Sequence, residues 1–176
     1  MERHGTRWWF GGLTVMLLVG GCGGGDRGIS SQHSVSTAFA PNAIVTRVID
    51  GDTIDATIGG HTERVRLIGI DTPETKKPNT PIQCYGPEAS DFTKHVLAEG
   101  TAVLIRRDAE ARDDYGRLLG YVYRSSDGLF VNLELAERGY ARPLSIAPNT
   151  TFAADFVRAA RDAEAANRGL WAACTG

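Results

Sequence analysis

The chain has 176 residues, of which 42% are hydrophobic and 23% are charged, enough for one compact domain with some additional sequence. Its formal net charge of −2 excludes a general electrostatic attraction to nucleic acid. Any role on nucleic acid must therefore depend on a local cationic site.

The N-terminal segment has the layout of an export signal. Two arginines precede the apolar run Trp8–Val19, which is too short to span a bilayer comfortably. The order Leu18-Val19-Gly20-Gly21-Cys22 resembles a bacterial lipobox, in which the cysteine becomes the lipidated first residue. We therefore predict a lipoprotein signal peptide over residues 1–21 and a lipid anchor on Cys22. The protein is then an exported cell-envelope lipoprotein, periplasmic or on the cell surface. A plain secretory signal with a chance cysteine, and hence a secreted protein, is the alternative.

Export also determines how the other cysteines are interpreted. If Cys22 carries lipid, Cys84 and Cys174 remain as an even pair in an oxidising compartment, where a disulfide is expected. Closing that loop would stabilise the fold by up to roughly 4–5 kcal/mol in the chain-entropy model. The alternative is a thiolate nucleophile paired with His61 or His95.

Three predicted strands follow a tether that is rich in Gly and Ser. The tether covers residues 22–42 and has no apolar periodicity, and the predicted domain covers residues 43–176. Turn signals of the Asp-Gly and Gly-Gly type separate three segments rich in β-branched and apolar residues: Ala43–Ile49, Thr53–Ile58 and Thr62–Ile70. These segments predict a three-stranded meander.

The remainder of the domain alternates between helical and strand patterns. Thr75–Cys84 contains lysines and prolines and is predicted to be an exposed loop. Periodicity and helix-start signals then predict helices over residues 86–99, Val131–Arg138 and Thr151–Arg168, and strands over Thr101–Arg106 and Leu118–Tyr123. The order predicts an α+β fold, a five-stranded OB-fold β-barrel with three packed helices. We expect it to be a monomer.

The stretch Arg66–Glu74 concentrates reactive side chains at the end of a predicted strand. Each feature has an ordinary explanation when it is taken alone. Asp50-Gly51-Asp52 can be only a turn, Arg66 can point from its strand to water, and Arg117 can be a charge beside a turn. The acids of Asp71–Glu74 can form a capping box, although no helix follows them.

Taken together, these residues provide the parts of metal-assisted phosphodiester hydrolysis. Carboxylates of Asp52 and Asp71 and a main-chain carbonyl at Thr72 are oxygen ligands of the kind that Ca²⁺ prefers. Glu74 can activate water. The guanidiniums of Arg66 and Arg117 can each hold phosphate oxygens through paired hydrogen bonds.

The residues resemble the thermonuclease, or staphylococcal-nuclease-like, family from about Ile44 to Trp171. The resemblance rests on segments in family order: Val48–Thr53, Arg66–Thr75, Tyr85–Ser90, Asp114–Arg117, Asn132-Leu133 and Gly169–Trp171. It implies an OB-fold nuclease that uses Ca²⁺ to hydrolyse DNA and RNA and leaves 3′-phosphate ends.

The resemblance also implies a role for each matching residue. Metal ligation falls to the side chains of Asp52 and Asp71 and to the Thr72 carbonyl. Catalysis falls to Glu74, which positions or deprotonates the attacking water, and to Arg66 and Arg117, which hold the scissile phosphate. Nucleotide binding falls to Tyr115, which would contact the phosphate or the sugar of the nucleotide.

The sequence departs from the family pattern near the nucleotide base. Leu144 and Ile146 stand where the family's best-known member has two base-flanking tyrosines, and Asp114 stands where a lysine would contact phosphate. Tyr140 is a candidate to supply the missing base contact. A non-catalytic nucleic-acid-binding OB module is the alternative function, but it would not need both arginines and the acids together. A glycosidase would leave both arginines unexplained.

Overall fold

The computed structural model describes residues 39–76 and 81–174. The predicted signal peptide, the lipidation site Cys22 and most of the tether lie outside these residues. No helix of the described part is long and apolar enough to cross a membrane. The first described residues already contact the barrel: Asn42 exchanges side-chain hydrogen bonds with the main chain of Ile105, and Phe39 packs against Tyr123.

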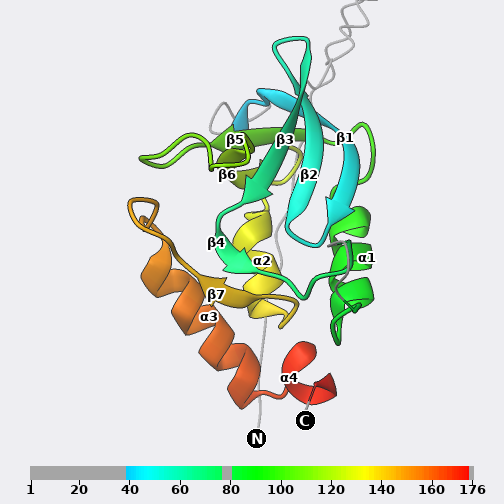
Figure 1. The fold of residues 1–176 in the computed structure, drawn as a ribbon, viewed down its shortest axis with the longest axis vertical. Coiled ribbons are helices and arrows are strands. Elements are labelled where there is room, and N and C mark those ends of the chain that lie inside the picture. Colours follow the sequence, from blue (N-terminus) through cyan, green and yellow to red (C-terminus); the bar gives the residue numbers. More distant parts are fainter. Residues whose placement is uncertain (1–38, 77–80, 175–176) are drawn as a thin grey trace, which may run out of the picture. The chain divides into compact units, whose positions relative to one another are not determined.

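Five strands close into a barrel in the order β1-β2-β3-β6-β5 (Figure 1). They are β1 Ala43–Asp50, β2 Thr53–Ile58, β3 His61–Leu67, β5 Ala102–Arg106 and β6 Leu118–Arg124. Neighbouring strands are antiparallel except β3 and β6, which are parallel. On β3 the buried Val65 and Leu67 alternate with more exposed residues, so the even-numbered residues face outward. The predicted five-stranded barrel is confirmed.

The third predicted strand, Thr62–Ile70, is wrong at its end because the chain leaves the barrel at Gly69. Gly69 has φ +85°, and a Cβ there would lie 2.0 Å from the ring of Phe156. A short strand β4, Gly69–Asp71, therefore pairs outside the barrel with β7, Arg142–Leu144, which the sequence did not predict. This break directs the following acids toward the barrel rim.

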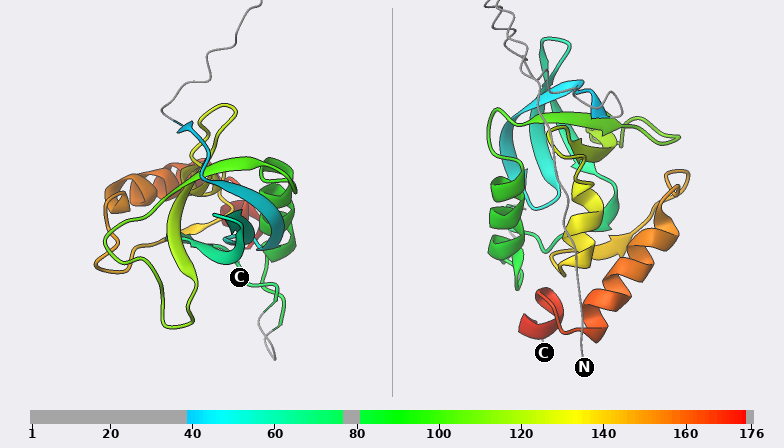
Figure 2. Two further views of the ribbon diagram at one scale, coloured as in Figure 1. Left: turned by 90° about the horizontal axis from the view of Figure 1, so that it is seen from above. Right: turned by 180° about the vertical axis from the view of Figure 1, so that it is seen from behind.

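Helices cover the open end and one side of the barrel (Figures 1 and 2). They are α1 Gly86–Val96, α2 Val131–Glu137, α3 Ala153–Ala165 and a short α4 Leu170–Ala173. The three predicted helices are present, and the described residues add α4 to them. Asn132 of α2 is fully buried, and its amide donates to the carbonyl oxygens of Ile68 and Gly120. It thereby fixes the point where β3 passes into β4.

A disulfide joins the loop before α1 to the C-terminal end of the described chain. Cys84 and Cys174 are bonded, with Cα atoms 5.9 Å apart and a separation of 90 positions in the sequence. No thiolate is therefore available at Cys84, and the alternative of a cysteine nucleophile is wrong.

Candidate active site

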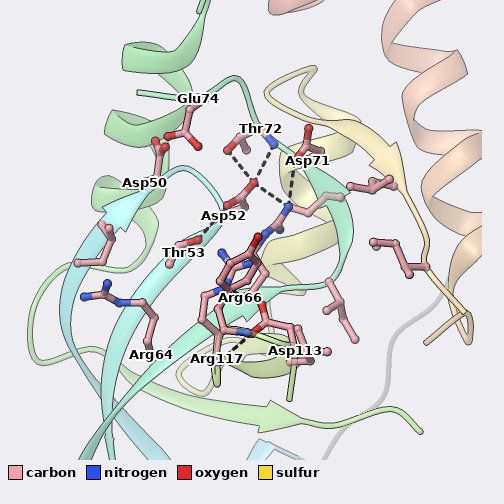
Figure 3. Close-up of a pocket in the computed structure, with 18 of the residues that line it drawn as sticks. Asp50, Asp52, Thr53, Arg64, Arg66, Asp71, Thr72, Glu74, Asp113 and Arg117 are labelled. Carbon is pink, nitrogen blue, oxygen red and sulfur yellow. Dashed lines mark hydrogen bonds and ion pairs between the residues drawn. The ribbon is translucent and has the colours of Figure 1, made fainter. Parts of the chain in front are cut away.

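A cavity of about 830 Å³ opens where β3 passes into β4, beside the turn that precedes β6 (Figure 3). Every residue that the sequence predicted for metal ligation, catalysis or nucleotide binding lines it: Asp52, Arg66, Asp71, Thr72, Glu74, Tyr115 and Arg117. We call this space the cavity. The two predicted arginines thus lie on one side of the molecule, as the sequence interpretation requires.

Asp52 is held at the base of the cavity by a buried network. One carboxylate oxygen, Oδ2, accepts hydrogen bonds from the amide and the hydroxyl of Thr72 at 2.9 and 3.0 Å, and Oδ1 accepts from the hydroxyl of Thr53. Gly51 allows this approach, because a Cβ there would lie 2.7 Å from the Thr72 hydroxyl oxygen. The Asp-Gly-Asp turn between β1 and β2 therefore brings the Asp52 carboxylate against the loop after β4.

Arg66 joins two acids through a single nitrogen. Its Nη2 lies 3.2 Å from Asp52 Oδ2 and 3.0 Å from Asp71 Oδ1, and its Nη1 donates to the Leu67 carbonyl oxygen. The Arg66 side chain is only 12% exposed, whereas that of Asp71 is 56% exposed. Two carboxylates that contact one nitrogen are close enough to share a cation.

The opposite wall comes from the turn that precedes β6. Arg117 donates from Nε to Asp113 at 2.6 Å, and Asp113 also accepts from the Arg117 amide. The Arg117 guanidinium lies 5.5 Å from the centre of the Tyr115 ring, which is 85% exposed. Asp113 is not among the residues predicted from the sequence for this site, although it pairs with Arg117.

Glu74 lies on a third side, with its side chain toward that of Asp50 (Figure 3). Burial and the hydrogen bond that Asp50 shares with Glu74 raise the pKa of Asp50, against the lowering effect of Thr75 and Gly51, which donate hydrogen bonds to it. Gln83 holds the main chain of Glu74 in two ways. Its side-chain oxygen accepts a hydrogen bond from the main-chain amide of Glu74, and its own main-chain amide donates one to the Glu74 carbonyl oxygen. The sequence analysis assigned no role to Gln83 and explained Asp50 as a turn residue.

Of the residues expected around the nucleotide base, some line the cavity and one does not. Leu144 and Ile146 line the cavity and are 42% and 66% exposed, and Asp114 lines it as well. Tyr140 does not line it. Its ring stacks on those of Phe92 and Tyr85 at 4.4 and 5.5 Å, so the suggestion that Tyr140 supplies a base contact is wrong.

The cavity carries an excess of negative charge. Among the described residues that line it, seven are acidic and four are basic, a formal net charge of −3. Burial raises the pKa of Asp71, and the neighbouring charges of Asp52 and Glu74 raise it further, against the opposing effect of Arg66. The acids of the site thus outnumber its cations, and its carboxylate and carbonyl oxygens are ligands of the kind that a hard cation prefers.

A closed barrel with acids and guanidiniums in one cavity is the architecture of a nuclease-like OB fold. The chain belongs to the staphylococcal nuclease homologue family, whose model matches residues 64–173. The family resemblance predicted from the sequence is confirmed.

Individual relatives extend the match over most of the chain. A thermonuclease of Staphylococcus intermedius is 46% identical over 128 residues, which cover 73% of this chain and 74% of the relative. A thermonuclease of Staphylococcus hyicus is 42% identical over 146 residues, 83% of this chain and 85% of the relative. Endonuclease YncB of Bacillus subtilis is 38% identical over 142 residues, 80% of this chain and 66% of the relative.

Proposed function

We propose that the chain is a nuclease that uses Ca²⁺ to hydrolyse phosphodiester bonds of DNA and RNA and leaves 3′-phosphate ends. The observation that carries the proposal is the convergence of Arg66 and Arg117 with the acids Asp52, Asp71 and Glu74 in one cavity. The relatives named thermonuclease and endonuclease support the same activity.

The charge of the cavity supports a resident cation. A formal charge of −3 would repel a phosphodiester unless a cation offset it. Asp52 and Asp71 would hold the ion, with the Thr72 carbonyl as a further ligand. Within residues 39–76 and 81–174 no three His, Cys, Asp or Glu side chains are grouped for a metal, so carbonyl and water oxygens would complete the set. When bound, Ca²⁺ would polarise a phosphoryl oxygen and offset developing charge.

The chain's own residues would orient and stabilise the reacting phosphate. Water attacks phosphorus, the bond from phosphorus to the 5′ oxygen breaks, and the 5′ oxygen leaves as a hydroxyl after it takes up a proton. The phosphate stays on the 3′ oxygen. Arg66 and Arg117 would donate hydrogen bonds to its equatorial oxygens from two walls of the cavity, where charge increases in the transition state.

Glu74 would hold the attacking water and accept its proton. Asp50, whose pKa is raised first by burial and then by its hydrogen bond with Glu74, would donate that hydrogen bond to the Glu74 carboxylate when it carries a proton. Gln83 would keep the main chain of Glu74 in place. Asp50 and Gln83 are therefore positioning residues.

The proposal is tested by incubating the full-length protein with plasmid DNA and with RNA, in Ca²⁺ and in chelator. We expect cleavage only in Ca²⁺, with 5′ ends that a polynucleotide kinase labels without prior phosphatase treatment. Glu74→Gln should lose activity by about 10²–10⁴-fold, while Ca²⁺ still raises its melting temperature. The matched control is Glu99→Gln, which changes an exposed glutamate outside the cavity.

Three results would contradict the proposal in different ways. Equal cleavage in chelator would remove Ca²⁺ from the mechanism, and near-wild-type turnover of Glu74→Gln would remove Glu74. Binding of nucleic acid without cleavage under any divalent ion would favour a binding module instead.

We also propose that the protein is exported and anchored to the cell envelope through lipid on Cys22, and that it acts as a monomer. The order of residues 18–22 supports the anchor. Metabolic labelling with a fatty acid should mark the wild type but not Cys22→Ser, and sedimentation should give the mass of a single chain. Label that persists in Cys22→Ser would contradict the anchor.

A further inference from the structure

A second, smaller pocket adjoins the cavity on the outer face of the β2–β3 hairpin. We call it the side pocket; it has a volume of about 440 Å³ and is lined by Asp55, Thr62, Arg64, Tyr115, Gly116 and Arg117. Three of these residues, Arg64, Tyr115 and Arg117, also line the cavity. The two spaces therefore share a wall, and the exposed ring of Tyr115 belongs to it.

The pleat of β3 makes a line of side chains from one space to the other. Residues 62, 64 and 66 share the outer face of β3, because Val65 and Leu67 point into the barrel. Arg66 lies in the cavity, Thr62 lies in the side pocket, and Arg64 lines both. Alternate residues of a strand are about 7 Å apart, a separation comparable to that of successive phosphates in an extended single strand.

Charge distinguishes the side pocket from the cavity. Its described lining residues include two arginines and one aspartate, a formal net charge of +1. Both arginines line the cavity as well, so the two spaces differ mainly in their acids, seven in the cavity and one in the side pocket. Asp55 is 9% exposed and contacts two guanidiniums, those of Arg47 and Arg64, so it neutralises only one of them. Arg64 uses Nε and Nη2 on Asp55 and is 48% exposed, and no hydrogen bond of its Nη1 is found within the described residues. It retains donors for an anion.

The two walls of the side pocket are tied together by Arg112. Its guanidinium makes two hydrogen bonds of 2.8 Å to the carboxylate of Glu63 on β3, and a third of 2.8 Å to the carbonyl oxygen of Gly116. This contact holds the turn with Tyr115 and Gly116 over the strand that carries Arg64. A ligand would thus meet a formed pocket, which lowers the cost of binding.

We propose that the side pocket binds the phosphate next to the scissile one in a single-stranded nucleic acid, with Arg64 donating to its oxygens and Tyr115 stacking on the base between the two phosphates. The proposal rests on the proposed nuclease function and adds a second anchoring point to it. The positive pocket offsets the repulsion of a polyanion by the cavity, and an exposed aromatic ring stacks on any base.

The test uses short single-stranded oligonucleotides with one defined scissile phosphodiester. In one series, each neighbouring linkage in turn is replaced by an uncharged methylphosphonate, and kcat and KM are measured with wild type and Arg64→Gln in Ca²⁺. The matched control is Arg158→Gln, which removes an exposed arginine of α3 that also pairs with an aspartate, Asp155, but lies outside both pockets. Melting temperatures check that both variants fold.

We expect Arg64→Gln to raise KM about three- to five-fold with little change in kcat, because one exposed charge contact is lost. In the wild type, one particular methylphosphonate position should raise KM by a similar factor. In Arg64→Gln that same substitution should have no additional effect, and Arg158→Gln should behave as the wild type. Such non-additivity of the two changes would identify Arg64 as the contact of that phosphate.

The proposal is overturned if Arg64→Gln leaves KM unchanged, or if its effect is the same at every methylphosphonate position. An equal effect of Arg158→Gln would also overturn it, because net charge would then explain the result. Binding measured by fluorescence anisotropy in a Glu74→Gln background applies the same series without cleavage. If the wild type cleaves nothing, the proposed function fails, while the anisotropy series still decides for or against the side pocket.

Discussion

The cavity and the side pocket share three residues but differ in charge. The cavity has a formal charge of −3 and the side pocket +1, counted over their described residues. In the cavity Arg66 lies between two carboxylates, whereas beside the side pocket one carboxylate lies between two arginines. An excess of carboxylates favours binding of a metal cation, and an excess of guanidiniums favours binding of a polyanion. A site that cleaves a polyanion needs both, next to each other.

The largest expected effect is that of Arg66→Gln, which tests whether the cavity carries out catalysis while the side pocket contributes to substrate binding. Arg66→Gln should lower kcat by about 10²–10³-fold, equally for a dinucleotide and for a long strand, because the lost donors act on the reacting phosphate. Steady-state kinetics on both substrates measure this. An increase in KM with kcat unchanged would assign Arg66 to binding alone and would erase the difference between the two spaces.

Tyr115 tests the boundary between the two spaces. Tyr115→Ala should raise KM about ten-fold, since a base stacked on an aromatic ring contributes roughly 1–3 kcal/mol. Tyr115→Phe keeps the ring and should stay close to the wild type. If Tyr115→Phe is as impaired as Tyr115→Ala, the hydroxyl and not the ring carries the contact, and the side pocket loses its connection to a stacked base.

Gln83 tests whether the cavity depends on support far from the side pocket. Gln83→Ala should lower kcat roughly two- to ten-fold, because one side-chain hydrogen bond to the Glu74 amide, worth about 0.5–1.5 kcal/mol, is lost. KM and the effect of methylphosphonate linkages should not change. Ile82→Ala removes an exposed neighbour and serves as the control. A larger KM for Gln83→Ala would contradict a role confined to Glu74.

The smallest effect concerns the negative charge of the cavity itself. Because the pKa of Asp71 is raised in the folded protein, its ionisation costs stability, and this cost is absent at low pH and appears as pH rises through the raised pKa, above the ordinary value of 3.8. In chelator, Asp71→Asn should therefore gain stability relative to wild type between about pH 4 and pH 7. The gain should stay below about 1 kcal/mol, because the side chain is more than half exposed.

Denaturant titrations of both proteins at several pH values measure that difference. In Ca²⁺ the sign should reverse at neutral pH, since an ion bound to the wild type stabilises the folded state and the variant lacks one carboxylate ligand. A wild type that is more stable than Asp71→Asn at neutral pH in chelator would show that Arg66 already balances the acids.

Local patterns predicted much of this site because its central part is continuous in sequence. Arg66, Asp71, Thr72 and Glu74 lie within nine residues, so a strand that ends in a loop suffices to place them near one another. The residues that the sequence analysis missed lack such a pattern. Asp50 looks like half of a turn and Gln83 lies in a polar loop. Arg64 shares the outer face of its strand with Arg66, and in the sequence a charged residue on such a face looks like one that simply points to water.

The sequence by itself determined the order of the five barrel strands and the three longer helices, the family and the residues proposed for the chemistry, since periodicity, turn residues and motifs are properties of neighbouring positions. Only the tertiary structure decided the break at Gly69, the placement of Tyr140 in an aromatic stack, and the division of charge between two adjoining pockets. These features depend on contacts between residues distant in the chain. Asp55 lies in the side pocket beside Arg64 only because β2 pairs with β3 in the register that sets these two residues opposite each other.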